Sequence, residues 1–149
     1  MRPSKILAVL ALASLATLSL ATEGLKWLTS YSEAVKLSKK TKKPILADFT
    51  GSDWCTWCIR LHKEVFDQPA FAKWAKKNVI LLELDYPQAK PQPAAIKKQN
   101  SDLQQKYQIQ GYPTVLFLDH TGKVLGQYGY DRGGPPVWIK KAEEMIKGN

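Results

Sequence analysis

Cysteine is scarce in this chain: its 149 residues include only Cys55 and Cys58. Two cysteines are too few for a small protein held together by several disulfides, and too few for a zinc site built from four thiolates. Acidic residues are also in the minority, since 13 Asp and Glu stand against 22 Lys and Arg for a formal net charge of +9. A content of 44% hydrophobic residues excludes a disordered chain. The length suits one domain with a hydrophobic core.

The first 21 residues have the pattern of a secretory signal peptide. Arg2 and Lys5 precede an uncharged run from Ile6 to Leu20, and residues 19–21 offer small side chains at a cleavage site. This run is short for a membrane span, which needs about 20 residues, although a retained N-terminal anchor is the alternative. We predict that residues 1–21 are removed and that residues 22–149 form one domain, periplasmic or secreted and free of the membrane.

Short apolar runs alternate along the chain with segments of helical periodicity. Strands are predicted over residues 45–49, 79–84, 114–118 and 124–130. Helices are predicted in the segment before Pro44, over about 55–65, after Asp67, over about 101–107 and after Pro136. Strands that alternate with helices imply parallel pairing, and the tight turn between the last two strands implies an antiparallel hairpin. The fold class we expect is α/β, with a central mixed β-sheet flanked by helices.

Polar residues beside the predicted helices indicate where the helices begin. The candidate N-cap residues are, in chain order, Ser30 or Ser32, then Ser52 or Asp53, and finally Asp67. Residues 86–100 contain three prolines, three glutamines and three lysines. We therefore expect a solvated loop there, with at most a turn of helix near residues 94–98.

Both cysteines lie in one short motif, WCTWC at residues 54–58, between a predicted buried strand and a predicted helix. A disulfide across so short a loop would stabilise the fold by only about 2 kcal/mol, so a purely structural bridge is the weaker interpretation. The first turn of a helix places both sulfurs within bonding range, and its free N–H groups favour a thiolate at Cys55. Because thiolate is the nucleophile in disulfide exchange, we expect Cys55 to attack a disulfide and Cys58 to resolve the mixed disulfide.

Three segments follow one another in a characteristic order: ILADF at 45–49, WCTWC at 54–58 and GYPT at 111–114. In this order of strand, redox motif and cis-proline loop the chain resembles the thioredoxin family over roughly residues 25–147. Residues 48–55 are most similar to secreted bacterial thioredoxin-like proteins and to the periplasmic C-terminal domain of the transmembrane disulfide reductase. The resemblance implies a thioredoxin fold and thiol–disulfide exchange through a two-cysteine relay, without a diffusible cofactor.

The resemblance also implies roles for residues near the motif. Pro113 corresponds to the cis-proline of the substrate loop, and Tyr112 beside it either contacts substrate or packs on Trp54. Trp54 and Trp57 flank Cys55. We expect both indole rings to be exposed, as an apolar surface that receives an extended or unfolded polypeptide.

Asp48 lies on the predicted strand that leads to the cysteines. A carboxylate buried there has a raised pKa and can take the proton of Cys58, although a structural hydrogen bond is the plainer interpretation. The chain departs from thioredoxin in having Thr56-Trp57 where thioredoxin has Gly-Pro. The lysine that partners the acid in thioredoxin falls at Leu81, so we expect that pair to be lost.

His62 follows Cys58 by four residues, and Cys-x-x-Cys-x-x-x-His could bind copper or zinc. A binding module, either a chaperone or a metallochaperone, is therefore the alternative function; no fourth ligand is evident, and we expect no metal site. The basic residues are spread along the chain, which argues against a nucleic-acid partner. The sequence thus predicts a monomeric thiol–disulfide oxidoreductase, a reductase rather than an oxidase. Its expected partners are protein disulfides or dithiols and a redox partner protein.

Overall fold

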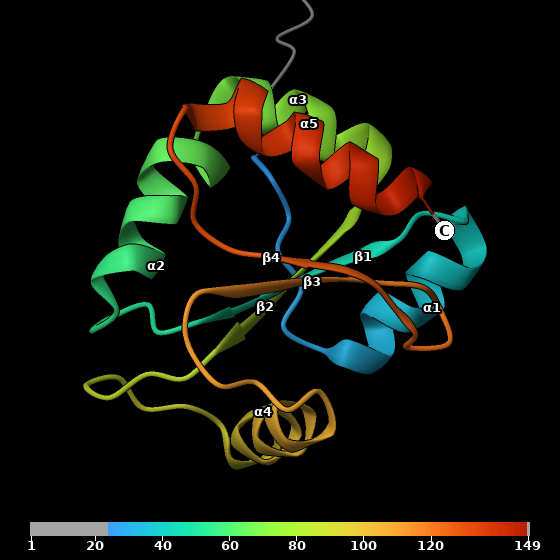
Figure 1. The fold of residues 1–149 in the computed structure, drawn as a ribbon. Coiled ribbons are helices and arrows are strands. Elements are labelled where there is room, and N and C mark those ends of the chain that lie inside the picture. The colour runs from blue at the N-terminus through green and yellow to red at the C-terminus, as the bar shows by residue number, and fades with distance from the viewer. Residues whose placement is uncertain (1–23, 149) are drawn as a thin grey trace, which may run out of the picture.

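In the computed structural model, which describes residues 24–148, the chain forms a four-stranded sheet in the order β2-β1-β3-β4 (Figure 1). The elements are α1 (Tyr31–Thr41), β1 (Ile45–Thr50), α2 (Thr56–Leu61), the π-helix η1 (His62–Phe66), α3 (Pro69–Asn78), β2 (Ile80–Asp85), α4 (Ala94–Lys106), β3 (Thr114–Leu118), β4 (Val124–Tyr128) and α5 (Gly134–Lys147). The signal peptide predicted over residues 1–21 lies outside the described residues. Within residues 24–148, no helix has the length and apolar character needed to cross a membrane.

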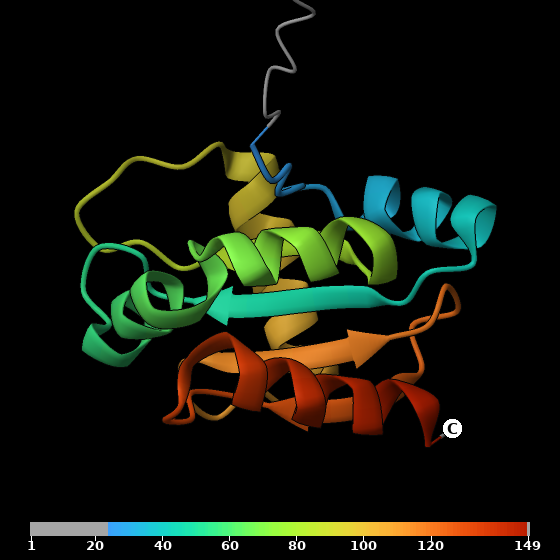
Figure 2. The same ribbon diagram turned by 90° about the horizontal axis from the view of Figure 1, so that it is seen from above.

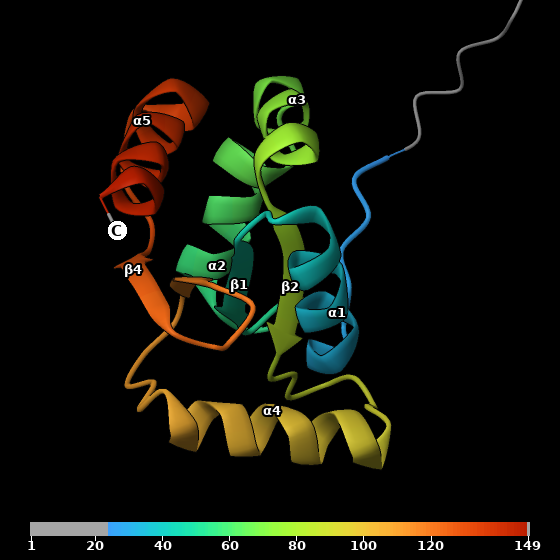
Figure 3. The same ribbon diagram turned by 90° about the vertical axis from the view of Figure 1, so that its right-hand side faces the viewer.

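The sheet is mixed, as predicted. β1 pairs with β2 in parallel, and β1 with β3 and β3 with β4 are antiparallel. Helices α3 and α5 cover one face of the sheet, while α1 and α4 lie on the other (Figures 1 and 3). Seen from above, α3 and α5 run along the strands, and α4 lies crosswise behind them (Figure 2).

Strand β1 is buried along its whole length because both of its faces are covered. Its side chains alternate between the two cores, as the pleat of a strand requires. Ile45, Ala47 and Phe49 join the core under α1 and α4, while Leu46 joins the core under α3 and α5. Asp48 follows the same alternation and is therefore directed to the face that carries α2 and η1.

The core under α3 and α5 is centred on Trp138, which is fully buried. Its ring contacts Phe66, Phe71 and Tyr128, with centroid distances of 5.2, 5.7 and 5.5 Å. The indole N–H donates a hydrogen bond of 2.9 Å to the carbonyl of Gly129, so its only polar group is satisfied. Trp138 thereby ties α5 to both η1 and the end of β4.

The largest difference from the predicted elements is α4. The segment expected as a loop with a separate short helix from residue 101 is instead one helix that starts directly after Pro93. Its periodicity is weak because few of its residues are apolar; Leu103 is a buried exception. Tertiary hydrogen bonds secure it: Asn100 Nδ2 donates to the carbonyl of Asp85, and Gln99 Nε2 donates to that of Thr29.

The structure also shows which of the predicted N-cap residues cap helices α1 and α3. Ser30 caps α1 through a hydrogen bond from the Glu33 N–H to its Oγ. Leu28, before that cap, forms a parallel bridge to Leu82 at the edge of the sheet. Asp67 does not cap α3, because the helix begins one residue later, with Gln68 at the cap position and Pro69 in the first turn.

Replacing Trp138 should test how far the fold depends on this aromatic core. We expect Trp138→Ala to lower the free energy of unfolding by about 3–5 kcal/mol, because it leaves a large cavity and removes a buried hydrogen bond. Urea unfolding followed by circular dichroism measures the change. The neighbouring Val137 is exposed, and Val137→Ala should stay within about 0.5 kcal/mol of the wild type. If Trp138→Ala lowered the free energy of unfolding by less than about 1 kcal/mol, Trp138 would not be the centre of this core.

Candidate active site

Cys55 and Cys58 lie where β1 has ended and α2 begins, and they form a disulfide in this structure. Cys55 is itself the N-cap residue, since its Sγ accepts a hydrogen bond of 3.2 Å from the N–H of Cys58. The prediction that Ser52 or Asp53 caps this helix is therefore wrong. Cys55 is 7% exposed and Cys58 only 1%, so Cys55 is the sulfur that a substrate can reach more easily.

Ser52 and Asp53 instead hold the loop before the motif. The backbone N–H and the hydroxyl of Ser52 both donate to the carboxylate of Asp85, at 2.9 and 2.6 Å. The carboxylate of Asp53 accepts three backbone N–H groups, from Gln88, Ala89 and Lys90. These hydrogen bonds hold the pKa of Asp53 below its ordinary value. The redox loop is thus fastened to the end of β2 and to the segment after it.

Aromatic side chains surround the motif on its solvent side. Trp54 is 39% exposed and Trp57 49%, which agrees with the prediction of an exposed apolar surface. Tyr112 packs edge-on against Trp54 at a centroid distance of 5.7 Å, which is one of its two predicted roles; its contact with substrate stays a prediction. Trp57 packs against Tyr130 at 5.2 Å, and the guanidinium of Arg60 lies 5.5 Å from the Trp57 ring.

The peptide bond between Tyr112 and Pro113 is cis, as the resemblance implies. Pro113 and Tyr112, together with Trp57 and Tyr130, line a hollow of about 460 Å³. This hollow joins the loop before β3 to the first turn of α2. The predicted substrate residues therefore meet on one surface beside the disulfide.

Asp48 is fully buried on β1, where its side chain meets His62 of η1. Its Oδ2 lies 2.8 Å from Nε2 of His62, and its Oδ1 has no hydrogen-bond partner among the described residues. Burial raises the pKa of Asp48, and the hydrogen bond and charge of His62 only partly offset this. The predicted burial of Asp48 is confirmed, and its role as the proton acceptor of Cys58 stays a prediction.

The partner of Asp48 is the feature that the sequence did not reveal. Its neighbour on β2 is Glu83, and Leu81 lies opposite Leu46, so the lysine pair is lost as predicted. His62, the first residue of η1, forms a hydrogen bond with Asp48 instead. The signal available in the sequence was the four-residue spacing between Cys58 and His62, which places both on one face of a helix.

Nε2 of His62 lies against Asp48, and the two sulfurs are bonded to each other in this structure. Among residues 24–148, no group of three or more His, Cys, Asp or Glu side chains is placed to hold a metal ion. The His62 ring instead packs against Trp27 and Phe66, at centroid distances of 5.7 and 5.0 Å.

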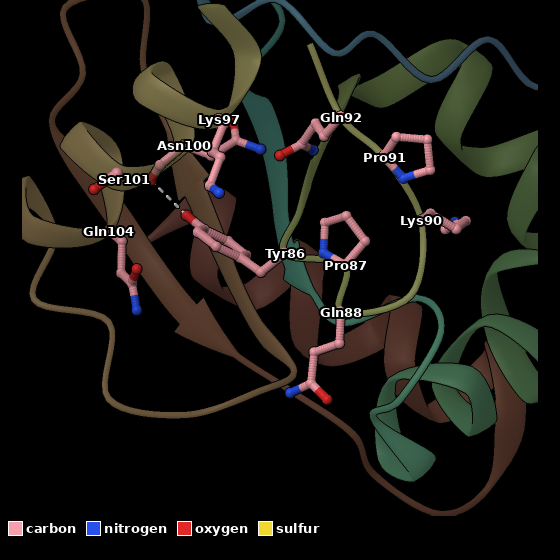
Figure 4. Close-up of a pocket in the computed structure, with 10 residues that line it drawn as sticks. All are labelled: Tyr86, Pro87, Gln88, Lys90, Pro91, Gln92, Lys97, Asn100, Ser101 and Gln104. Atoms are coloured by element: carbon pink, nitrogen blue, oxygen red, sulfur yellow. Dashed lines mark hydrogen bonds between the residues drawn. The ribbon is translucent and has the colours of Figure 1, made fainter. Parts of the chain in front are cut away.

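A second hollow, of about 440 Å³, lies between the segment after β2 and helix α4 (Figure 4). Tyr86 is on its wall, where its hydroxyl donates 2.6 Å to the carbonyl of Asn100 (Figure 4). None of the predicted site residues lines it, but the carbonyl of Tyr86 accepts the indole N–H of Trp54. The disulfide thus lies beside exposed aromatic side chains and outside this hollow.

Comparison with known proteins agrees with this geometry. The sequence model of the thioredoxin-like domain matches residues 31–133. Disulfide bond reductase DsbH of Chlamydia pneumoniae is 35% identical over 131 residues, which make up 88% of this chain and 78% of that protein. A solved structure of a DsbH oxidoreductase superposes with a TM-score of 0.81 at 31% identity, covering 99% of this chain and 96% of that one.

Longer relatives match over only part of their length. Thiol:disulfide interchange protein DsbD of Vibrio vulnificus is 33% identical over 90 residues, which are 60% of this chain and 14% of that protein. The mixed sheet, the flanking helices and these matches together establish the thioredoxin fold. The chain belongs to the thioredoxin-like family and is a thiol–disulfide oxidoreductase related to DsbH and to DsbD.

Proposed function

We propose that this protein reduces disulfides in other proteins, after export to the periplasm or the exterior, and that it acts as a monomer. The observation that carries the proposal is the Cys55–Cys58 disulfide at the start of α2, with the more exposed sulfur beside two exposed tryptophans. Reduction as the direction is supported by the likeness to a protein named disulfide bond reductase. The predicted leader over residues 1–21 supports export.

The reaction needs only the two cysteines and a base. The thiolate of Cys55 attacks a substrate disulfide, forming a mixed disulfide and releasing one substrate thiolate. Cys58 then gives its proton to Asp48 and attacks Cys55, which forms the Cys55–Cys58 bond and releases the second substrate thiolate. Both leaving thiolates take up a proton. Two electrons pass to the substrate, and a dithiol partner protein returns them to Cys55 and Cys58.

The surface around the motif supports a protein substrate. Trp57, Tyr112 and Pro113 line the hollow beside the disulfide, and Trp54 extends this surface through its contact with Tyr112. Large aromatic side chains on a surface contribute much of the binding energy in protein complexes. We propose that an extended segment of the substrate lies across this surface while its disulfide meets Cys55.

Substitution of each cysteine separates the two steps. We expect Cys55→Ser to abolish insulin reduction, because the attacking sulfur is gone. We expect Cys58→Ser to accumulate mixed disulfides with substrate, visible on non-reducing gels, because attack still occurs but resolution does not. Reduced wild-type protein that fails to reduce insulin would rule out the proposed activity.

The reduction potential of the Cys55–Cys58 couple decides the direction. We expect equilibration with glutathione or dithiothreitol to give a value near that of thioredoxin, about −270 mV. A value near about −120 mV, as in strong oxidants, would show that the protein introduces disulfides instead.

Trp57→Ala tests the substrate surface apart from the chemistry. We expect kcat/KM for a protein disulfide to fall about 5- to 30-fold, the equivalent of about 1–2 kcal/mol of lost contact. The rate with a small aromatic disulfide should stay close to that of the wild type, because that reagent needs only the sulfur. An equal loss with both substrates would place Trp57 in the chemistry or the fold rather than in substrate binding.

A further inference from the structure

The buried position of Asp48 raises a problem for its proposed role. The carboxylate is 0% exposed, so a proton accepted from Cys58 has no direct path to water. Its Oδ2 is held by His62 at 2.8 Å, and the His62 side chain is 25% exposed. His62 therefore touches Asp48 on one side and solvent on the other.

His62 is also close to Cys58. The two residues are one helical turn apart, and the N–H of His62 donates to the carbonyl of Cys58. Both side chains line one cavity of about 270 Å³, together with Thr50 and Ser52. The hydroxyl of Thr50, like Oδ1 of Asp48, is buried without a hydrogen-bond partner among residues 24–148. Thr50 thus brings an unpaired hydroxyl to the cavity that Cys58 and His62 share, and His62 joins this cavity to Asp48.

The backbone at His62 suits a functional rather than a merely structural position. The carbonyl of His62 accepts the N–H of Asp67, five residues on, at 2.8 Å, which marks the switch from α2 to the π-helix. Such π-helical turns occur frequently at functional sites. This π-helical turn begins at His62, whose ring forms the hydrogen bond to Asp48 on β1.

Acidic groups face His62 from several elements. Asp48 comes from β1, Glu83 from β2, and Asp67 from the end of η1; Asp85 on β2 acts on Asp48, and Lys63 lines the same cavity. Burial lowers the pKa of His62, but the hydrogen bond and charge of Asp48, aided by Glu83 and Asp67, outweigh it and hold that pKa above its ordinary value. The hydrogen bond and charge of His62 in turn favour the ionised form of Asp48, although burial keeps the pKa of Asp48 above its ordinary value.

We propose that His62 is a positioning residue that acts through Asp48, as its counter-charge and as the exit for the proton of Cys58. The inference rests on the proposed two-cysteine reaction. In the resolving step the Cys58 thiol passes its proton to Asp48, and the Cys58 sulfur displaces the substrate thiolate from Cys55. His62 then gives its own proton to water and takes the proton from Asp48, which restores the pair.

A reagent with a coloured leaving thiolate, 5,5′-dithiobis(2-nitrobenzoate), resolves the two steps in one trace. Cys55 of the reduced protein releases the first coloured thiolate by attack, and Cys58 releases the second by resolving the mixed disulfide. His62→Gln keeps a polar side chain but cannot carry the proton. We expect the second phase at neutral pH to slow on the order of 10- to 100-fold, while the first phase is unchanged.

The pH dependence of the second-phase rate should change in a definite direction in His62→Gln. Without the positive charge of His62, Asp48 stays protonated up to a higher pH and cannot accept the proton of Cys58 until then. The rise of the second-phase rate with pH should therefore move to higher pH in His62→Gln. The matched control is His120→Gln, the same change at the other histidine, which lies after β3 and should leave both phases at wild-type values. A wild-type pH profile for His62→Gln would overturn the proposal.

A double substitution tests whether His62 works through Asp48. If it does, Asp48→Asn combined with His62→Gln should be no slower in the second phase than Asp48→Asn alone. Independent, multiplying losses would show that His62 acts by another route and would refute the proposal.

A measurement on the wild type avoids any question of misfolded variants. We expect the His62 ring, followed by NMR, to titrate at different pH in the oxidised and reduced proteins, because reduction adds a titrating Cys58 thiol beside the pair. Identical titration in both states would sink the proposal. Failure of the proposed two-cysteine reaction itself would look different. In that case the wild-type protein would never release the second coloured thiolate.

Discussion

Burial of β1 on both faces is the constraint on which the rest of this molecule depends. Three of its side chains anchor the core under α1 and α4, while Leu46 anchors the core under α3 and α5. Because the side chains of a strand alternate, this arrangement also fixes Asp48 on the side of α2 and η1. The strand that stabilises the fold therefore places a carboxylate beneath the redox motif, and the loop that leaves it carries Cys55.

A carboxylate in that position is costly unless it is paired, and the pairing links the core to the chemistry. His62 reaches Asp48 from a π-helical turn, and its ring is held by Trp27 and Phe66. Phe66 in turn belongs to the aromatic core around Trp138. The orientation of the acid–histidine pair thus depends on the same packing that joins α5 to the sheet, so in the proposed mechanism stability and reactivity rest on shared contacts.

Hydrogen bonds hold the loop and the tryptophan that form the active-site surface, and this surface is broad rather than a deep pocket. Asp85 and Asp53 fasten the loop before Cys55 by hydrogen bonds from Ser52 and from the segment after β2, and Trp54 is tied to the carbonyl of Tyr86. The disulfide is held at the edge of a broad aromatic surface, while the 440 Å³ hollow lies to one side. In the proposed reaction, this geometry presents a sulfur to a large partner without requiring the partner to enter a pocket.

The sequence by itself determined the strands, the redox motif and the exposed tryptophans, because each leaves a local mark: an apolar run, a cysteine spacing, or aromatic residues beside it. It did not predict α4 as one helix, since Asn100 and Gln99 secure that helix through carbonyls elsewhere in the fold. It also placed the cap of α2 on Ser52 or Asp53, whose side-chain partners lie at and beyond the end of β2. Only the tertiary structure joined Asp48 to His62. The two residues lie on different elements, and the packing of η1 on the face of β1 that carries Leu46 brings their side chains to 2.8 Å.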